Sequence, residues 1–152
     1  MKKAGVAIAT FFGVGHLPVA PGTWASMLTA LIAFFTPLST LPAPYLVLVT
    51  AAVYALGIPA AGICEKHYKR HDPRQCVIDE VAGQLVSLWF LPRQAGFYIA
   101  AFLLFRIFDI LKPFPVNKSE ALPRGIGIMT DDMLAGAYAL LVLQGLRYIF
   151  LN

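Results

Sequence analysis

The chain has 152 residues, 59% of them hydrophobic and 13% charged, which is enough sequence for a single domain spanning residues 1–152. In a typical soluble domain about a quarter of the residues are charged. Here the charged residues are also unevenly placed, because no Asp, Glu, Lys or Arg occurs between Ala4 and Cys64. The composition therefore excludes an ordinary soluble surface and predicts integration into a membrane.

Long runs of Ala, Leu, Val, Ile and Phe without strand alternation predict helices in the N-terminal half. The opening apolar stretch resembles a signal peptide, but glycines interrupt it and no cleavage site follows, so we expect it to be retained. After a Gly/Pro-rich segment at 13–22, a helix is expected over about 23–40, capped by Thr23 and bent near Pro37. An uncharged helix follows over about 45–64, long enough to cross a bilayer.

The second half predicts a polar loop and three further helices. The segment 65–75 is rich in Lys and Arg, and two shorter helices follow over about 77–91 and 96–111. Two prolines end the second of these, and a last apolar helix is expected over about 131–150. The fold class is therefore all-α, a multi-pass membrane bundle of about five to six helices.

Positive charges indicate how the bundle is oriented. With an even number of crossings before the polar loop, all the Lys and Arg residues except Arg93 and Arg147 lie on one side. That side should be cytoplasmic, and its basic residues should contact anionic lipid headgroups; no RNA-binding motif accompanies them, so we expect no nucleic-acid partner. Cys64 and Cys76 have no metal-ligand spacing and are expected to be reduced thiols.

Five of the eight acidic residues lie in apolar sequence at three separate places: Asp79, Glu80, Asp109, Asp131 and Asp132. Such carboxylates are costly unless they are paired or bound to a cation. Asp79 lies about 13 residues before the turn at Pro92 and Asp109 about 14 residues after Ala95, roughly 20 Å of helix on each arm at 1.5 Å per residue. An antiparallel hairpin would bring them to one level at the cytoplasmic end, where the last helix also begins. This cluster suits a hard cation such as Mg²⁺.

Each acidic position also has a structural explanation. The two adjacent aspartates could cap the last helix, and the Asp79–Glu80 pair could be an ordinary helix start. Asp109 could form a structural ion pair with Arg106 or Lys112, one turn to either side. A common depth for all three positions favours a shared site. Because Arg and Lys both bind phosphate, the alternation of acids and cations fits a phosphate monoester better than a bare cation pathway.

The glycine-rich segment before the first long helix is a weak candidate for a phosphate cradle. Glycines and a helix N-terminus expose backbone N–H groups, although a simple turn entering a membrane helix explains the same pattern. His16 in this segment could donate a proton to a leaving group or anchor the chain at the membrane interface.

Four blocks of the sequence resemble the phosphatidylglycerophosphatase A family of bacterial magnesium-dependent lipid phosphatases. They cover residues 18–23, 78–84, 105–115 and 127–136, in family order and over nearly the whole chain. Two departures are small: Ala25 stands where the family often has glycine, and Phe114 replaces a common tryptophan. The resemblance implies a helical fold and hydrolysis of phosphatidylglycerophosphate to phosphatidylglycerol, the last step in making that anionic lipid. We therefore expect a bacterial inner-membrane enzyme whose site faces the cytoplasm.

By chemistry, the simplest hypothesis is a cluster of carboxylates that binds one or two Mg²⁺ ions and activates water. The expected metal ligands are Asp79, Glu80, Asp109, Asp131 and Asp132. The expected catalytic residues are Asp79, Asp109, Lys112 and Asp132. The expected phosphate-binding residues are Thr23, Ser26, Arg106 and Lys112. An aspartyl-phosphate intermediate stays an alternative, although its usual D-x-D-x-[TV] pattern is absent from the sequence.

Other functions use the same residues differently. A small transporter could bind a cation or proton at these carboxylates, an accessory protein could bind the lipid without turnover, and a transferase could act on the same lipid. The sequence does not decide whether the chain forms a homo-oligomer.

Overall fold

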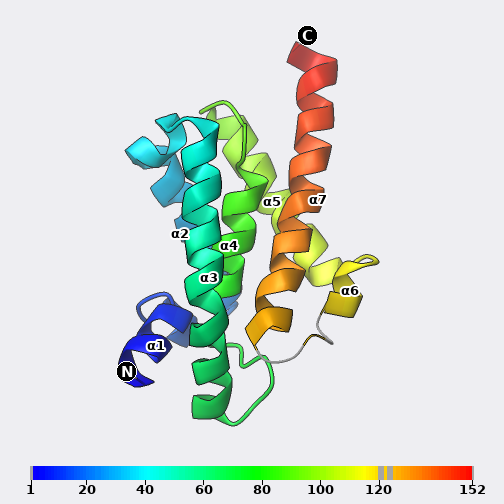
Figure 1. The fold of residues 1–152 in the computed structure, drawn as a ribbon. Helices are drawn as coiled ribbons and strands as arrows, with labels where there is room; N and C mark the ends of the chain where they lie inside the picture. Colours follow the sequence, from blue (N-terminus) through cyan, green and yellow to red (C-terminus); the bar gives the residue numbers. More distant parts are fainter. Residues whose placement is uncertain (1, 120–121, 123–124, 152) are drawn as a thin grey trace.

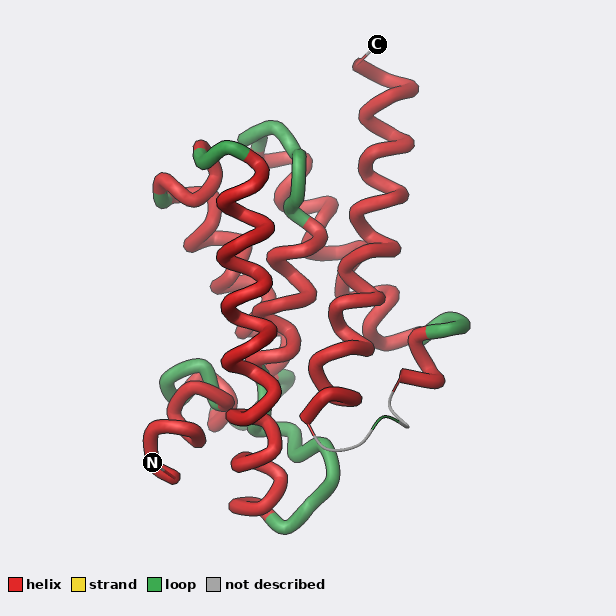
Figure 2. Tube along the Cα trace, in the orientation of Figure 1, coloured by secondary structure: helices red, strands yellow, loops and turns green. Residues whose placement is uncertain are grey.

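A computed structural model of the chain describes residues 2–119, 122 and 125–151 (Figure 1). Within these residues every regular element is a helix, as Figure 2 shows, which confirms the all-α prediction. There are seven α-helices in the described part, more than the five to six expected. The additional ones are short: α1 (Lys2–Ala9) and α6 (Val116–Ser119).

The first long helix, α2 (Pro21–Phe35), differs from its prediction at both ends. It begins at Pro21, whose fixed φ suits the first helical position, and Thr23 lies inside it. It ends at Phe35 because a residue that precedes proline avoids the helical region, and Thr36 is extended. Pro37 therefore starts a separate 3₁₀ helix (Pro37–Thr40), where a bend within one helix was expected.

Helix α3 (Ala43–Tyr68) continues beyond its expected end at Cys64 and takes in the start of the basic segment. Helix α4 (Ile78–Ser87) stops earlier than predicted, whereas α5 (Ala95–Leu111) matches its prediction closely. Helix α7 (Gly125–Leu151) begins six residues before Asp131. Asp131 and Asp132 therefore lie inside the helix, which excludes the explanation that they cap its start.

Helix α4 is the centre of the bundle, packed against α2, α3, α5 and α7. Nine of its ten residues are buried, and Glu80 is the exception. Figure 1 shows α4 between α3 and α7, with the N-terminus, the α3–α4 loop and the start of α7 at one end of the bundle. The C-terminus lies at the opposite end.

The outer surfaces of the long helices are apolar. Leu56 on α3 and Leu141 on α7 are 60% and 68% exposed. Helix α3 and residues 125–149 of α7 are each long and apolar enough to cross a bilayer. Exposed leucines on two such helices indicate membrane association, because contact with lipid would remove this apolar surface from water.

Candidate acidic site

The close crossing of α4 and α7 positions the site. A Cβ atom on Gly136 would overlap the carbonyl oxygen of Gly83, so the two backbones touch there, and only glycine at both positions permits this approach. Asp79 lies four residues before Gly83, and Asp132 lies four residues before Gly136. Each aspartate is thus one turn before the contact, on the same face of its helix.

Three carboxylates meet at this level. One oxygen each from Asp79, Glu80 and Asp132 lies within 4.8 Å of the others. Asp79 and Asp132 are buried, at 7% and 3% exposure, and Glu80 is partly buried. We call these three side chains the acidic triad.

Helix α5 contributes a fourth carboxylate and a guanidinium group. The Arg106 Nη1 atom lies 2.6 Å from Asp109 Oδ2 and 3.9 Å from Glu80 Oε1. Asp109 also contacts Asp132. The sequence-based expectation that Asp79 and Asp109 share one depth therefore agrees with the structure, and the ion pair between Arg106 and Asp109 forms part of the same cluster.

The two adjacent aspartates of α7 have different surroundings. Asp131 accepts a hydrogen bond from Lys112 Nζ at 2.8 Å, and its other carboxylate oxygen accepts one from the backbone N–H of Asp132. Asp132 Oδ2, in contrast, is buried without a hydrogen-bond partner. Asp131 belongs with Lys112 at the edge of the site, and Asp132 belongs to the acidic triad.

The triad has the features of a cation site. Asp79 Oδ1, Glu80 Oε2 and Asp132 Oδ2 are all buried and without partners among the described atoms. Buried carboxylates in contact repel one another unless a proton or a cation lies between them. An all-oxygen donor set at this spacing fits a hard divalent ion. The triad could therefore hold a metal ion.

Electrostatics point the same way for the two acids of α4. Burial, together with the nearby Glu80 and Asp132 carboxylates, raises the pKa of Asp79 well above its ordinary range. Burial also raises the pKa of Glu80 to about 7, with Asp109 adding to the shift, while a hydrogen bond to Asp79 and the Arg106 charge oppose it. Without a bound cation, the site would hold protons near neutral pH.

The structure adds Asp72, which the sequence analysis did not single out. This residue of the α3–α4 loop lines a 140 Å³ pocket with His71, Ile128 and Asp131. Its charge acts on Asp79. Only its acidity within a basic loop could have drawn attention to it, since its position depends on a left-handed backbone with φ of 44°.

The glycine-rich segment does not form an open cradle at the start of α2. The Glu80 carboxylate fills the space beside Gly22, so close that a Cβ there would overlap it. Ser26 is fully buried and donates its hydroxyl to the Gly22 carbonyl oxygen at 2.8 Å, while Thr23 is partly buried. A phosphate contact by Thr23 or Ser26 stays a prediction.

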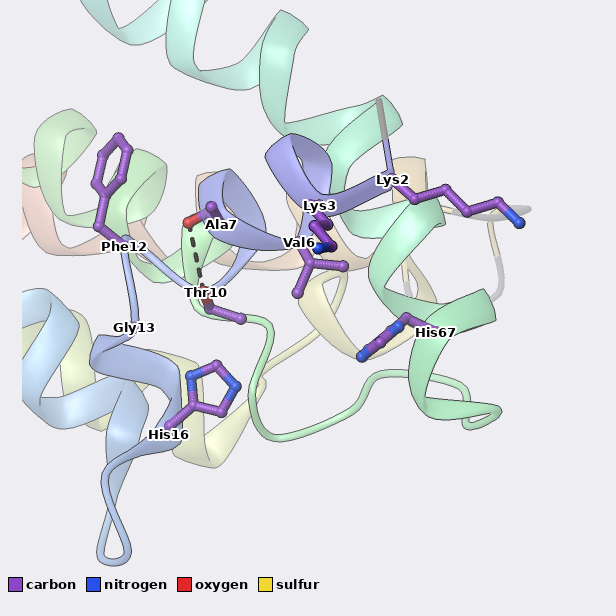
Figure 3. A pocket seen from close by; sticks show the side chains of 9 residues that line it. All are labelled: Lys2, Lys3, Val6, Ala7, Thr10, Phe12, Gly13, His16 and His67. Atoms are coloured by element: carbon purple, nitrogen blue, oxygen red, sulfur yellow. Dashed lines mark hydrogen bonds between the residues drawn. The ribbon is translucent and has the colours of Figure 1, made fainter.

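His16 belongs to a different part of the surface. Its Nε2 atom lies 2.8 Å from the Tyr68 hydroxyl, at the edge of a 550 Å³ pocket between α1 and the end of α3 (Figure 3). Lys2, Lys3 and His67 line the same pocket, together with apolar residues such as Val6 and Phe12.

The two cysteines, Cys64 and Cys76, are both free thiols and both buried.

Comparison with known proteins identifies the family. The sequence profile of phosphatidylglycerophosphatase A matches residues 7–147 of the chain. The chain belongs to the phosphatidylglycerophosphatase A family. It is therefore a lipid phosphatase of this family, and the four sequence blocks quoted above lie within the matched region.

Three relatives match over most of their length. A Bacteroides thetaiotaomicron protein provisionally named phosphatidylinositol-3-phosphatase is 40% identical over 151 residues, covering 95% of this chain and 94% of the relative. The phosphatidylglycerophosphatase A of Haemophilus influenzae is 38% identical over 146 residues, covering 93% and 87%. That of Escherichia coli is 34% identical over 131 residues, covering 85% and 75%. No solved structure shows a significant match.

Proposed function

We propose that the chain hydrolyses the phosphate monoester of phosphatidylglycerophosphate, giving phosphatidylglycerol and inorganic phosphate. The observation that carries the proposal is the acidic triad with two cations beside it. Arg106 is held by Asp109 at 2.6 Å, and Lys112 is held by Asp131 at 2.8 Å. A dianionic phosphate needs such cations, and a metal-assisted hydrolysis needs such buried carboxylates.

The proposed metal is Mg²⁺, held by Asp79, Glu80 and Asp132, because small hard cations prefer carboxylate oxygens. When bound, the ion would polarise the phosphate and lower the pKa of a water molecule. Asp109 contacts both the triad and Arg106, so it would link the metal ligands to the phosphate-binding side of the site.

The protein groups have separable tasks in this mechanism. Arg106 and Lys112 would orient the phosphate and stabilise its charge as water attacks phosphorus. The bond between phosphorus and the glycerol oxygen breaks, and that oxygen takes up a proton from solvent, which balances the proton lost by the attacking water. Asp79, whose Oδ1 atom is buried without a hydrogen-bond partner, is the proposed acceptor for the proton of the attacking water once a bound cation keeps its carboxylate ionised.

A second substrate is supported by one relative. The Bacteroides protein is provisionally named a phosphatidylinositol-3-phosphatase. Phosphatidylinositol 3-phosphate also carries a phosphate monoester on a membrane lipid, so the same triad and cations could act on it. We favour phosphatidylglycerophosphate because two of the three relatives are named for it.

We also propose a membrane orientation. Helices α3 and α7 would span the bilayer, with α2 and α5 alongside them and α4 enclosed. Helix α1, which begins at Lys2, and the basic α3–α4 loop lie at the same end of the bundle as the start of α7 (Figure 1). The positive-inside rule assigns that end to the cytoplasm of an inner membrane.

Phosphate release from the purified protein in detergent tests the function. We expect release from phosphatidylglycerophosphate with Mg²⁺ and none with EDTA, and a lower rate with phosphatidylinositol 3-phosphate. Asp79→Asn should abolish release, whereas Glu65→Gln should keep it, because Glu65 pairs with His71 outside the triad. Inactivity on both lipids in the presence of Mg²⁺ would refute the proposal and favour an ion-binding membrane protein.

A further inference from the structure

An apolar groove lies between α2 and α5. It has a volume of about 220 Å³, and its walls include Met27, Leu31 and Phe34 from α2 and Tyr98, Ile99 and Phe102 from α5. Leu31 is 43% exposed and Ile99 is 59% exposed, so the groove opens to the outside of the bundle. Its lining is formed by hydrocarbon and aromatic side chains.

The groove leads to the polar site along α5. Ile99, Phe102, Arg106 and Asp109 follow one another at spacings of four and three residues, which places them on one helical face. Arg106 lies one turn beyond Phe102, roughly 6 Å along the helix at 1.5 Å per residue. The apolar wall therefore ends where the phosphate-binding cation begins.

The opposite wall runs toward the same end of the bundle. On α2, Met27 lies five residues after Gly22, and Gly22 touches the Glu80 carboxylate. Near the far end of the groove, the rings of Phe34 and Tyr98 contact each other edge to face, with their centroids 5.2 Å apart. From Tyr98, which lines the groove, to Arg106 the rise along α5 is about 12 Å at 1.5 Å per residue.

We propose that this groove seats an acyl chain of the lipid substrate while the phosphate lies beside Arg106 and the triad. The inference rests on the proposed lipid phosphatase activity and adds where the substrate's tail binds. Continuity with the polar site identifies the occupant. A lipid that merely surrounds the protein has no reason to align with Arg106, whereas a substrate whose phosphate is held there must direct its tail along an adjoining surface.

The first test compares substrates of different chain length. kcat/KM is measured for long-chain phosphatidylglycerophosphate and for its dibutanoyl analogue in the same detergent, with Ile99→Trp and Leu31→Trp to fill the groove. The long-chain to short-chain ratio should fall by roughly tenfold in both variants, since the tail loses its apolar contacts. Leu141→Trp, at an exposed position on α7, is the matched control and should leave the ratio unchanged. An unchanged ratio in the groove variants would overturn the proposal.

The second test does not depend on turnover. Long-chain phosphatidylglycerophosphate with a diazirine in one acyl chain is photolysed with the wild-type protein in EDTA, and labelled peptides are identified. Labelling should concentrate on 27–34 and 95–102 and should decrease when unlabelled long-chain substrate is added. Labelling spread uniformly over the outer surfaces of α3 and α7, and not reduced by unlabelled substrate, would mean general lipid contact only. That result would overturn the proposal. If the protein releases phosphate from neither substrate, the phosphatase proposal fails, and the labelling pattern still decides the groove.

Discussion

Gly136 of α7 rests against the carbonyl of Gly83 in α4, and this contact holds Asp79 and Asp132 together one turn away. Both positions carry the same short pattern, Asp-x-x-Ala-Gly, at 79–83 and again at 132–136. In each helix the pattern places a carboxylate one turn before a glycine of the backbone crossing. The geometry of the site therefore depends on the absence of a side chain at both glycines.

Gly136→Ala should therefore separate the helices and disable the site. The added methyl group overlaps backbone, which cannot rotate away, so we expect a loss of about 1–3 kcal/mol in stability and at least about tenfold in phosphate release. Gly145→Ala in the same helix is the control, because its Cβ would meet nothing within 4 Å. It should be neutral or stabilising. Equal activity of the two variants would contradict the role given to the crossing.

Arg106→Lys should lower kcat/KM by about tenfold or more. Lysine keeps the charge but loses the planar fork that can hold Asp109 and a phosphate at once. Arg147→Lys is the matched control, since Arg147 donates to the Phe90 carbonyl oxygen at the other end of the bundle. Steady-state kinetics on phosphatidylglycerophosphate would compare the two variants. A wild-type value of kcat/KM in Arg106→Lys would contradict a role of Arg106 in phosphate binding.

The pKa shift of Glu80 gives the metal-free protein a specific pH dependence. Its pKa is about 7 in the folded protein and near 4.5 in an unfolded chain, so the folded state binds more protons between these values. Stability contributed by the protonated carboxyl is therefore complete below pH about 4.5 and is lost as pH rises through about 7.

In EDTA, the midpoint temperature of thermal unfolding should therefore fall as the pH is raised from 5 to 8. Glu80→Gln should reduce the fall, because its side chain does not titrate. Saturating Mg²⁺ should raise the midpoint more at pH 8 than at pH 6, since the ion displaces protons. A wild-type midpoint that falls no more steeply over this window than that of Glu80→Gln would contradict the assignment.

The depth of Asp79 and Asp109 could be predicted from the sequence because a helix has a fixed rise per residue. Helix ends depended on more than local pattern. Residues 125–130 were expected to precede the last helix, yet Ile128 and Met129 are buried in the core, at 4% and 0% exposure, and packing extends α7 through them. Tertiary burial outweighed the local helix-start pattern at Asp131 and Asp132.

The different contacts of Asp131 and Asp132 could not be predicted from helix geometry alone. Adjacent residues point about 100° apart on a helix, and which one faces α4 depends on the crossing at Gly83. The sequence assigned both to the metal; the structure places Asp132 in the triad and pairs Asp131 with Lys112. The repeated Asp-x-x-Ala-Gly pattern was visible and could have made this distinction.

Metal binding by these two neighbours is the most direct test of the central claim. Mn²⁺ can stand in for Mg²⁺ because both prefer oxygen ligands, and its binding to the detergent-solubilised protein can be followed by electron paramagnetic resonance. Asp132→Asn should weaken binding by about tenfold or more, whereas Asp131→Asn, the same change one residue away, should bind nearly as well as wild type. Equal binding by wild type and Asp132→Asn would contradict a metal centre formed by Asp79, Glu80 and Asp132.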